Sequence, residues 1–250
     1  MKYFLYSLFL AISFSCANQV EKTDALAEHG DDDRPTNTEV IEESDAAGKL
    51  YLRTIMVSGS IGSGLTITWI YFGDDGIVVY DPANGVNPIN YAAERANNID
   101  NVGKYKIQGD HLIINWDNGK TSNVGIEYQN GDINIIDGGI TVRQAGVPAG
   151  FMLNGRYAGG AINKSMSAVH TYFFKDDGSF ILKRQGSVNT TKDGPGSAED
   201  EKPGNYTITG NTLTLQYQDG TKQKAVIGVK NMKGGYNYLI INQTSFRMEK

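Results

Sequence analysis

The chain of 250 residues contains one long pattern twice. Residues 69–76 read WIYFGDDG, and residues 171–178 read TYFFKDDG. Residues 103–119, GKYKIQGDHLIINWDNG, match residues 204–220, GNYTITGNTLTLQYQDG. The first pair is offset by 102 residues and the second by 101. Because solenoid repeats have periods of about 20–50 residues, this offset predicts two copies of one domain.

Both copies alternate apolar and polar residues in short runs, which is the period of a β-strand. Leu213, Leu215 and Tyr217 fall on one face in this way, and the first copy repeats the pattern. The strands expected in the second copy are residues 155–159, 169–174, 179–183, 204–209, 212–216, 222–229, 236–242 and 245–248. About eight short strands without helices between them predict an all-β fold of two tandem small antiparallel meander β-barrels. The barrels are expected at residues 48–147 and 148–250.

The repeated Asp-Asp-Gly sequences, residues 74–76 and 176–178, lie between apolar strands. Asp-Gly in this position is a strong hairpin signal, since the tight turn needs a positive φ angle. A catalytic carboxylate pair or a calcium loop is the alternative. A calcium loop requires further oxygen ligands at set spacing, which the sequence lacks. We therefore favour the turn and expect no metal site.

Each copy is expected to carry an irregular insertion after its third strand, at residues 81–102 and 185–203. Residues 89–95 in the first insertion are predicted to form one or two helical turns. Long loops in compact domains often serve as binding lids. Sequence drift of a surface loop is the alternative. Any functional difference between the copies is expected in these two segments.

The N-terminus predicts export. Residues 1–15 have a basic start, an apolar run and small residues at the end, as in a signal peptide. Residues 13–16, Ser-Phe-Ser-Cys, resemble the lipobox of bacterial lipoproteins, although Ser13 and Phe14 depart from its usual pattern. The resemblance implies a lipid on Cys16, the only cysteine; ordinary secretion is the alternative.

Residues 16–47 are expected to form a disordered acidic linker after this cysteine. Within them, ten Asp and Glu stand against two Lys and Arg. Such a segment has too few apolar groups to offset the entropy of ordering. Residues 48–250 are close to neutral in charge, which argues against a nucleic-acid partner.

The frame resembles the lipocalin-like β-barrel lipoproteins common in Bacteroidota. The resemblance rests on G-x-Y-x-I-x-G-x-x-L-x-L with a following Asp-Gly turn, and on residues 153–157, Leu-Asn-Gly-Arg-Tyr. It implies that Tyr157 takes the place of the first-strand Trp of lipocalins and that Arg247 covers its ring. In the first copy, residues 48–51 lack the opening motif while Arg143 is in the matching late position. Closure of the first barrel in the same way is therefore left open.

Catalytic chemistry is not expected. Nucleophilic catalysis needs a nucleophile, a base and a group that orients it. The predicted barrels offer only His111 and His170, and the acid–base pairs that can be built are Asp74 with His111 and Asp176 with His170. The sequence contains no nucleophile elbow, P-loop or zinc-protease motif. We predict no enzyme activity and no cofactor.

Two functions remain. The first is a binding module for a small apolar molecule or a glycan, and the second is a structural or interaction lipoprotein that works through its surface. Location in the outer membrane or periplasm of a Gram-negative bacterium is expected for both, with no prediction of oligomeric state. The aromatic residues below either contact a ligand or fill the cores. The candidates for ligand binding are Trp69, Tyr91, Trp116, Tyr172 and Tyr217.

Overall fold

The computed structural model describes residues 48–59, 62–162, 166–190, 194–230 and 238–249. The predicted signal peptide, Cys16 and the acidic linker lie outside the described residues. The helices in the described part of the chain are not long and apolar enough to cross a membrane.

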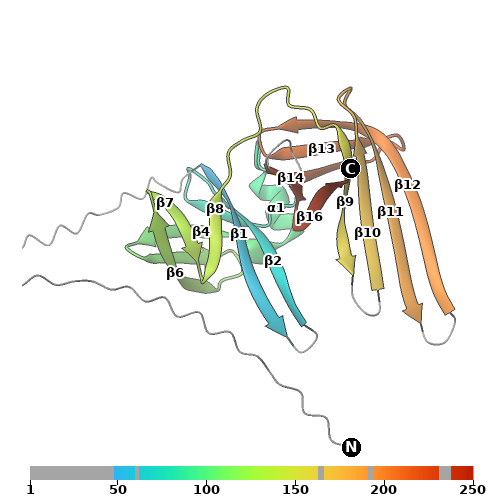
Figure 1. Ribbon diagram of the computed structural model, residues 1–250. Coiled ribbons are helices and arrows are strands. Elements are labelled where there is room, and N and C mark those ends of the chain that lie inside the picture. The colour runs from blue at the N-terminus through green and yellow to red at the C-terminus, as the bar shows by residue number, and fades with distance from the viewer. Residues whose placement is uncertain (1–47, 60–61, 163–165, 191–193, 231–237, 250) are drawn as a thin grey trace, which may run out of the picture. The chain divides into compact units, whose positions relative to one another are not determined.

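The described chain forms two closed antiparallel barrels of eight strands each (Figure 1). The first contains β1 (Lys49–Gly59), β2 (Gly62–Phe72), β3 (Ile77–Tyr80), β4 (Val102–Gln108), β5 (His111–Trp116), β6 (Thr121–Gln129), β7 (Asp132–Ile136) and β8 (Gly139–Arg143). The second contains β9 (Gly155–Ile162), β10 (Met166–Phe174), β11 (Ser179–Thr190), β12 (Gly194–Thr209), β13 (Thr212–Tyr217), β14 (Lys222–Lys230), β15 (Tyr238–Ile241) and β16 (Thr244–Glu249). The predicted all-β fold of two barrels is confirmed.

Both barrels close by pairing their first strand with their last. Tyr51 pairs with Ile70, and Tyr157 pairs with Tyr172. Because Ile70 and Tyr172 are related by the 102-residue repeat, Tyr51 is the counterpart of Tyr157. The first barrel therefore closes in the same way as the second, although its sequence lacks the opening motif.

The expected stacking of Arg247 on Tyr157 is wrong. Tyr157 is buried in the core, whereas Arg247 is exposed and pairs with Ala158. Since neighbouring residues of a strand point to opposite faces, Arg247 lies on the outside of the barrel. A cation does cover an aromatic ring on the outer face, where the Arg156 guanidinium lies 5.4 Å from the centre of the Phe173 ring.

The repeated Asp-Asp-Gly sequences form hairpin turns, as predicted. Gly76 has a φ of 75° and Gly178 a φ of 83°, which is the region that favours glycine. The Asp177 carboxylate accepts a hydrogen bond from the Ser179 N–H at 2.8 Å. Asp75 accepts the corresponding bond from the amide two residues further on, at 3.2 Å. The aspartates are thus used by the turns.

A tyrosine of the repeated Gly-x-Tyr sequence holds each of these turns. The Tyr206 hydroxyl lies 2.9 Å from both the Leu153 and the Lys175 carbonyl oxygens, and it accepts the Leu153 N–H at 2.8 Å. In the first barrel, the Tyr105 hydroxyl donates to the Gly73 carbonyl oxygen at 3.2 Å. Gly73 and Lys175 are themselves related by the repeat, so the Gly-x-Tyr motif stabilises the same turn in both barrels.

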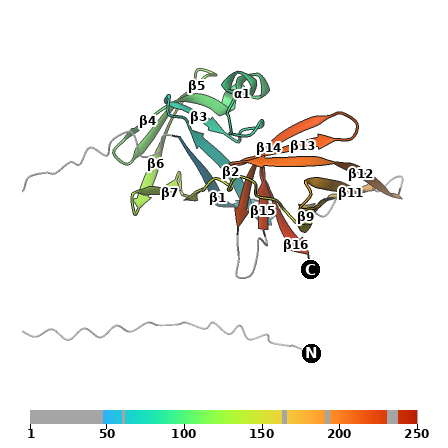
Figure 2. The same ribbon diagram turned by 90° about the horizontal axis from the view of Figure 1, so that it is seen from above.

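After the third strand the two barrels differ. In the first, the chain leaves the barrel at Asp81 and forms α1 (Tyr91–Asn97) and η2 (Ile99–Asn101), close to the predicted helical turns. Arg95 of α1 pairs with Asp117 at 2.6 Å, which ties the helix to the β5–β6 turn. Figure 2 shows α1 beside β5.

In the second barrel, the predicted irregular insertion at residues 185–203 is wrong. Residues 185–190 of β11 pair with residues 194–199 of β12 and extend the hairpin. The Gly, Ser and Pro content lowers strand propensity, but the ladder forms between backbone groups. Residues 194–203 pair on one side only, since β13 begins its pairing at Gly204, and an edge strand tolerates proline.

Each barrel has a packed interior, and a third apolar cluster lies outside both. The first core contains Tyr51, Ile70, Phe72, Val78, Leu112, Ile114, Ile126, Ile133 and Ile136. The third cluster joins Leu50, Trp69 and Val86 to Val226 of the second barrel. Both barrels belong to one compact unit of the chain.

Candidate functional site

The interior of the second barrel is filled by aromatic rings. Tyr172 stacks on Phe174 with ring centres 5.2 Å apart, and its edge meets Phe246 at 5.2 Å. Tyr217 packs edge-on against Phe180 at 5.4 Å, and Tyr172 contacts the same ring. Two predicted site residues, Tyr172 and Tyr217, thus lie in one cluster of rings. This cluster also contains Phe174, Phe180 and Phe246, and we call it the aromatic floor.

Polar side chains follow on the inner face beyond this floor. His170 and Arg184 lie directly opposite each other on β10 and β11, two residues beyond the Tyr172–Leu182 pair. Because directly paired residues share a face of the sheet, both point inward like Tyr172. On β12, Asp200 pairs with Arg184, and Lys202 occupies the next inward position. We call His170, Arg184, Asp200 and Lys202 the polar ring.

Arg184 is the unusual member of the polar ring. Its Nε is buried and has no hydrogen-bond partner among the described residues. Burial raises the pKa of Tyr217, and the charge of Arg184 and a side-chain hydrogen bond with Arg184 oppose that rise. Burial lowers the pKa of His170, and Arg184 lowers it further. Arg184 therefore lies close to the floor with donor capacity left over, a state that costs about 1–3 kcal/mol.

The other charges do not cancel Arg184. The Asp200 carboxylate lies 3.9 Å from the Lys202 ammonium. Two cations thus face one carboxylate in the polar ring, before any charge on His170 is counted. The ring therefore favours an anionic group.

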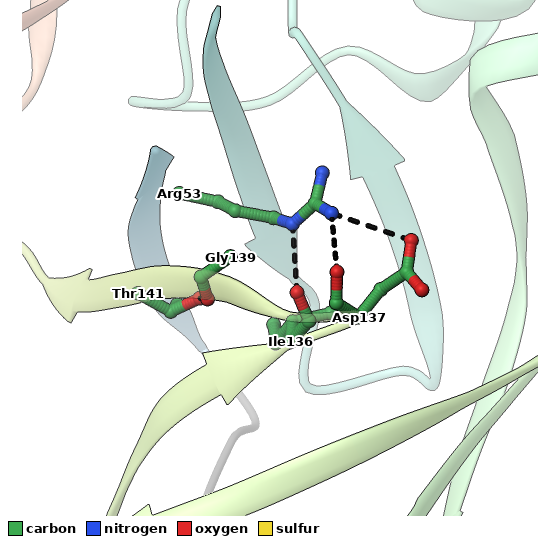
Figure 3. Close-up of polar contacts among 5 residues, drawn as sticks. All are labelled: Arg53, Ile136, Asp137, Gly139 and Thr141. Atoms are coloured by element: carbon green, nitrogen blue, oxygen red, sulfur yellow. Dashed lines mark hydrogen bonds and ion pairs between the residues drawn. The ribbon is translucent and has the colours of Figure 1, made fainter. Parts of the chain in front are cut away.

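The first barrel uses its inner cation differently (Figure 3). Arg53, on the inner face of β1, donates from Nε to the Ile136 carbonyl oxygen at 2.8 Å. Its NH2 donates to the Asp137 carbonyl oxygen at 2.9 Å and to the Asp137 carboxylate at 3.3 Å. The guanidinium is thus bound to the β7–β8 turn and closes that end of the barrel.

The register explains why no Arg184 counterpart exists in the first barrel. Counting from the Tyr51–Tyr157 equivalence, Arg53 occupies the place of Gly159. The place of Arg184 falls after Tyr80, where β3 has ended and the chain has left the sheet. The polar ring is therefore a feature of the second barrel.

The remaining predicted site residues lie apart from the polar ring. Trp116 is in the first core, where its Nε1 donates to Ser122 Oγ at 2.7 Å and its ring meets Tyr80. Tyr91 is on α1, and its hydroxyl donates to the Asp75 carboxylate at 3.0 Å. The structure does not bring these residues together.

Trp69 lies on the outer face of the first barrel and is only 1 % exposed. Its Nε1 donates to the Asn242 carbonyl oxygen in the β15–β16 turn. That turn corresponds to the β7–β8 turn, whose carbonyl oxygen accepts from Arg53. Trp69 is therefore part of the contact between the barrels.

The two acid–base pairs that the sequence allowed are not formed among the described residues. His111 Nδ1 lies 2.8 Å from Asn123 Oδ1, and its Nε2 lies 3.5 Å from Asp110. His170 faces Arg184, while Asp176 is exposed in a turn. Within the described residues, no three His, Cys, Asp or Glu side chains are placed to hold a metal ion.

Arg184 and Lys202 were not among the predicted site residues. Arg184 follows the strand predicted at residues 179–183, and Lys202 lies in the segment 185–203, which was predicted to be irregular. The signal was present in the alternation of Phe180, Leu182 and Arg184, which places all three on one face. The predicted strand ended at residue 183, just before this charged residue, whereas β11 continues to Thr190.

A model of the lipocalin-like domain family matches residues 155–236. Comparisons with curated proteins and with solved structures gave no match. The matched range begins with β9 and includes the polar ring and the rings of the floor other than Phe246. Lipocalin-like barrels fit a binding module for small hydrophobic ligands, and the fold is typically one of binding rather than catalysis.

Proposed function

We propose that the protein is a non-catalytic binding module whose second barrel takes a small apolar molecule with an anionic end group. The observation that carries this proposal is the buried, unpartnered Nε of Arg184 next to an aromatic floor. The rings supply apolar contact, and the guanidinium supplies a charge-assisted hydrogen bond to a carboxylate. No step of this function requires a nucleophile or a general base.

The polar ring and the floor together select against simpler ligands. A neutral hydrocarbon leaves the Arg184 Nε without a partner. A free polyol places hydroxyl groups against the Phe174, Phe180 and Phe246 rings, which offer no hydrogen-bond acceptors of comparable strength. An amphiphile satisfies both parts of the site.

Isothermal titration calorimetry with octanoate and 1-octanol tests the proposal. Tryptophan fluorescence is a poor reporter, because Trp69 and Trp116 both belong to the first barrel. We expect octanoate to bind more tightly than octanol. Arg184→Gln should weaken octanoate binding about tenfold, as expected for a lost hydrogen bond to a charged group, and leave octanol binding unchanged.

Arg156→Gln is the matched control, since Arg156 lies on the outer face and pairs with Glu249. It should bind both probes like the unmodified protein. Equal octanoate affinity in the Arg184→Gln and Arg156→Gln variants contradicts the proposed site.

We also propose that the protein is exported and anchored in the outer membrane or periplasm of a Gram-negative bacterium through a lipid on Cys16. The apolar run of residues 1–15 and the cysteine that follows support this. Expression in a Gram-negative host with an alkyne-tagged fatty acid should label the protein, and Cys16→Ser should abolish the label. Equal labelling of both proteins contradicts the anchor.

A surface role is the second candidate, supported by an exposed apolar face on β8, β1 and β2. Met56 is 67 % exposed and pairs with Leu65, while Ile140 and Val142 lie outward on β8. Such faces often mark contacts with other proteins. Sedimentation velocity should then show self-association that a Met56→Glu/Ile140→Glu variant loses. A monomer at about 100 μM removes this support.

A further inference from the structure

A pocket of about 510 Å³ lies outside the packed core of the first barrel. It forms where the beginnings of β1 and β7 meet the end of β8 and the segment that follows β3. Its lining includes Lys49, Tyr71, Asn87, Asp132, Arg143 and Gln144. Its volume falls in the range of about 300–1,000 Å³ that is typical of small-molecule sites.

Asp132 is at the centre of the charges in this pocket. Its Oδ1 lies 3.9 Å from the Lys49 ammonium, 3.6 Å from Arg143 NH1, and 3.3 Å from the Tyr51 hydroxyl that donates to it. The two distances to the cations exceed the usual hydrogen-bond lengths, so Lys49 and Arg143 both keep N–H donors that Asp132 does not use. The Lys49 side chain is only 16 % exposed, which makes a closer partner for its ammonium favourable.

Two amides add both donors and acceptors. Asn87 Oδ1 accepts the Asn211 N–H at 2.9 Å, which leaves the Asn87 amino group for the pocket. Gln144 Nε2 donates to the Val142 carbonyl oxygen at 3.0 Å, which leaves the Gln144 carbonyl oxygen as an acceptor. The half-buried ring of Tyr71 contributes an apolar wall.

This lining distinguishes between classes of ligand. As in the polar ring, two cations accompany one carboxylate, but here Asp132 lies within 4 Å of both of them, so an anion that reaches either cation is repelled by Asp132. An apolar molecule removes water from Lys49 and Arg143 without replacing it. A neutral saccharide both donates and accepts hydrogen bonds through its hydroxyl groups and presents apolar C–H faces to Tyr71.

We infer that this pocket binds a neutral saccharide, with Asp132 accepting from its hydroxyl groups and Lys49 and Arg143 donating to them. The site is separate from the polar ring of the second barrel. The saccharide proposal can therefore be tested separately from the amphiphile proposal.

The test is a ¹H–¹⁵N NMR titration of the protein with cellobiose, maltose and N,N′-diacetylchitobiose. At least one of these should shift the amides of Gly48, Gln144 and Gly146, which line the pocket, and leave the amide of Gly186 unshifted. The same shifts should appear in the Arg184→Gln variant. No shift at the pocket with any of the three disaccharides at 20 mM overturns the inference.

Asp132→Asn distinguishes a saccharide site from an anion site, because it should change the affinity for the two kinds of ligand in opposite directions. Saccharide affinity should fall about tenfold, because a charged acceptor is lost. Affinity for sulfate should rise in the same variant if the pocket is an anion site. Unchanged or higher saccharide affinity in Asp132→Asn contradicts the inference, as does full displacement of the saccharide by sulfate.

Arg143→Gln provides a second variant that leaves Asp132 in place, and it should also weaken saccharide binding. Arg247→Gln, on the outside of the second barrel, is the matched control and should bind like the unmodified protein. The dispersion of each NMR spectrum shows whether the variant is folded. Equal affinities for Arg143→Gln and Arg247→Gln contradict the assigned role of Arg143.

Discussion

At the scale of single residues, Tyr206 and Arg184 differ in how their polar atoms are satisfied. Both lie within the second barrel. The Tyr206 hydroxyl has backbone partners at Leu153 and Lys175, whereas the Arg184 Nε has none among the described residues. Since buried polar groups are normally paired, the hydroxyl of Tyr206 is explained by stability, whereas the Nε of Arg184 is the observation on which the proposed ligand site rests.

Tyr206→Phe should lower the free energy of unfolding by about 1–3 kcal/mol, because the Leu153 N–H loses its partner in a buried setting. Tyr105→Phe should cost less, about 0.5–1.5 kcal/mol, because its hydroxyl bonds to the Gly73 carbonyl oxygen at a longer distance. Urea denaturation measures both. A larger loss for Tyr105→Phe contradicts this reading of the two turns.

The pKa of His170 should lie below its ordinary value of 6.5 in the folded protein, first because of burial and then because of Arg184. The unfolded protein therefore binds this proton at higher pH than the folded one. Stability should fall as the pH drops through about 6.5 towards the folded pKa, and it should lose nothing further from this group below that value.

An NMR titration of His170 checks this shift directly. Arg184→Gln should raise the pKa of His170 towards 6.5 without reaching it, since burial remains. Arg156→Gln, on the outer face, should leave the pKa of His170 where it was. An unchanged pKa of His170 in Arg184→Gln contradicts the predicted effect of the Arg184 charge on His170.

At the scale of elements, close strand packing explains the glycine of the Gly-x-Tyr motif. A Cβ on Gly204 overlaps the Gln216 carbonyl oxygen and lies 2.7 Å from the Phe180 ring. On Gly125, in the middle of β6, a Cβ meets nothing within 4 Å. The repeated glycine is therefore required by the packing of β12 on β13.

Gly204→Ala should lower the free energy of unfolding by roughly 1–3 kcal/mol, the usual cost of overpacking. Gly125→Ala should be neutral or stabilise by up to about 1 kcal/mol, because alanine reduces the freedom of the unfolded chain. Urea denaturation of the two variants gives the comparison. Equal losses for both substitutions count against a packing role for Gly204.

The segment after the third strand has a different use in each barrel. In the second, it continues as the β11–β12 hairpin and carries Arg184 and Lys202 beyond the aromatic floor. In the first, it leaves the sheet and brings Val86 and Asn87 to the second barrel. The expected functional difference between these segments stays a prediction.

At the scale of the whole molecule, hydrogen bonds and apolar contacts join the barrels. The Thr212 hydroxyl accepts the N–H groups of Val86 and Asn87, both at 2.8 Å. Trp69 donates to Asn242 across the same contact, and Val226 is fully buried there. These contacts should make the two barrels unfold together.

Thr212→Val keeps the shape of the side chain but leaves two amide groups without an acceptor, at a cost of about 1–3 kcal/mol each. Differential scanning calorimetry should show one transition for the unmodified protein and a lower or divided transition for Thr212→Val. Thr214→Val, on the same outer face of β13, is the control and should behave like the unmodified protein. Two transitions in the unmodified protein contradict the coupling.

The sequence alone determined the features that depend on neighbours along the chain. Alternation over a few residues indicates strands, Asp-Gly indicates turns, and a long repeat indicates two copies of one domain. The all-β fold, the two barrels and the helix after Tyr80 could therefore be predicted. The strand segments at residues 185–190 and 194–203 could not, because their low intrinsic propensity is overcome by the pairing of β11 with β12.

Only the tertiary structure decided which faces are buried and which polar groups lack a partner. The consecutive buried residues Ala225 to Gly228 show the reason: one face packs in a core and the other against the first barrel. Trp69 likewise became a contact residue, while the Nε of Arg184 became a buried donor without a partner among the described residues. Both outcomes depend on residues more than a hundred positions away or on the register of strands, which local sequence does not encode.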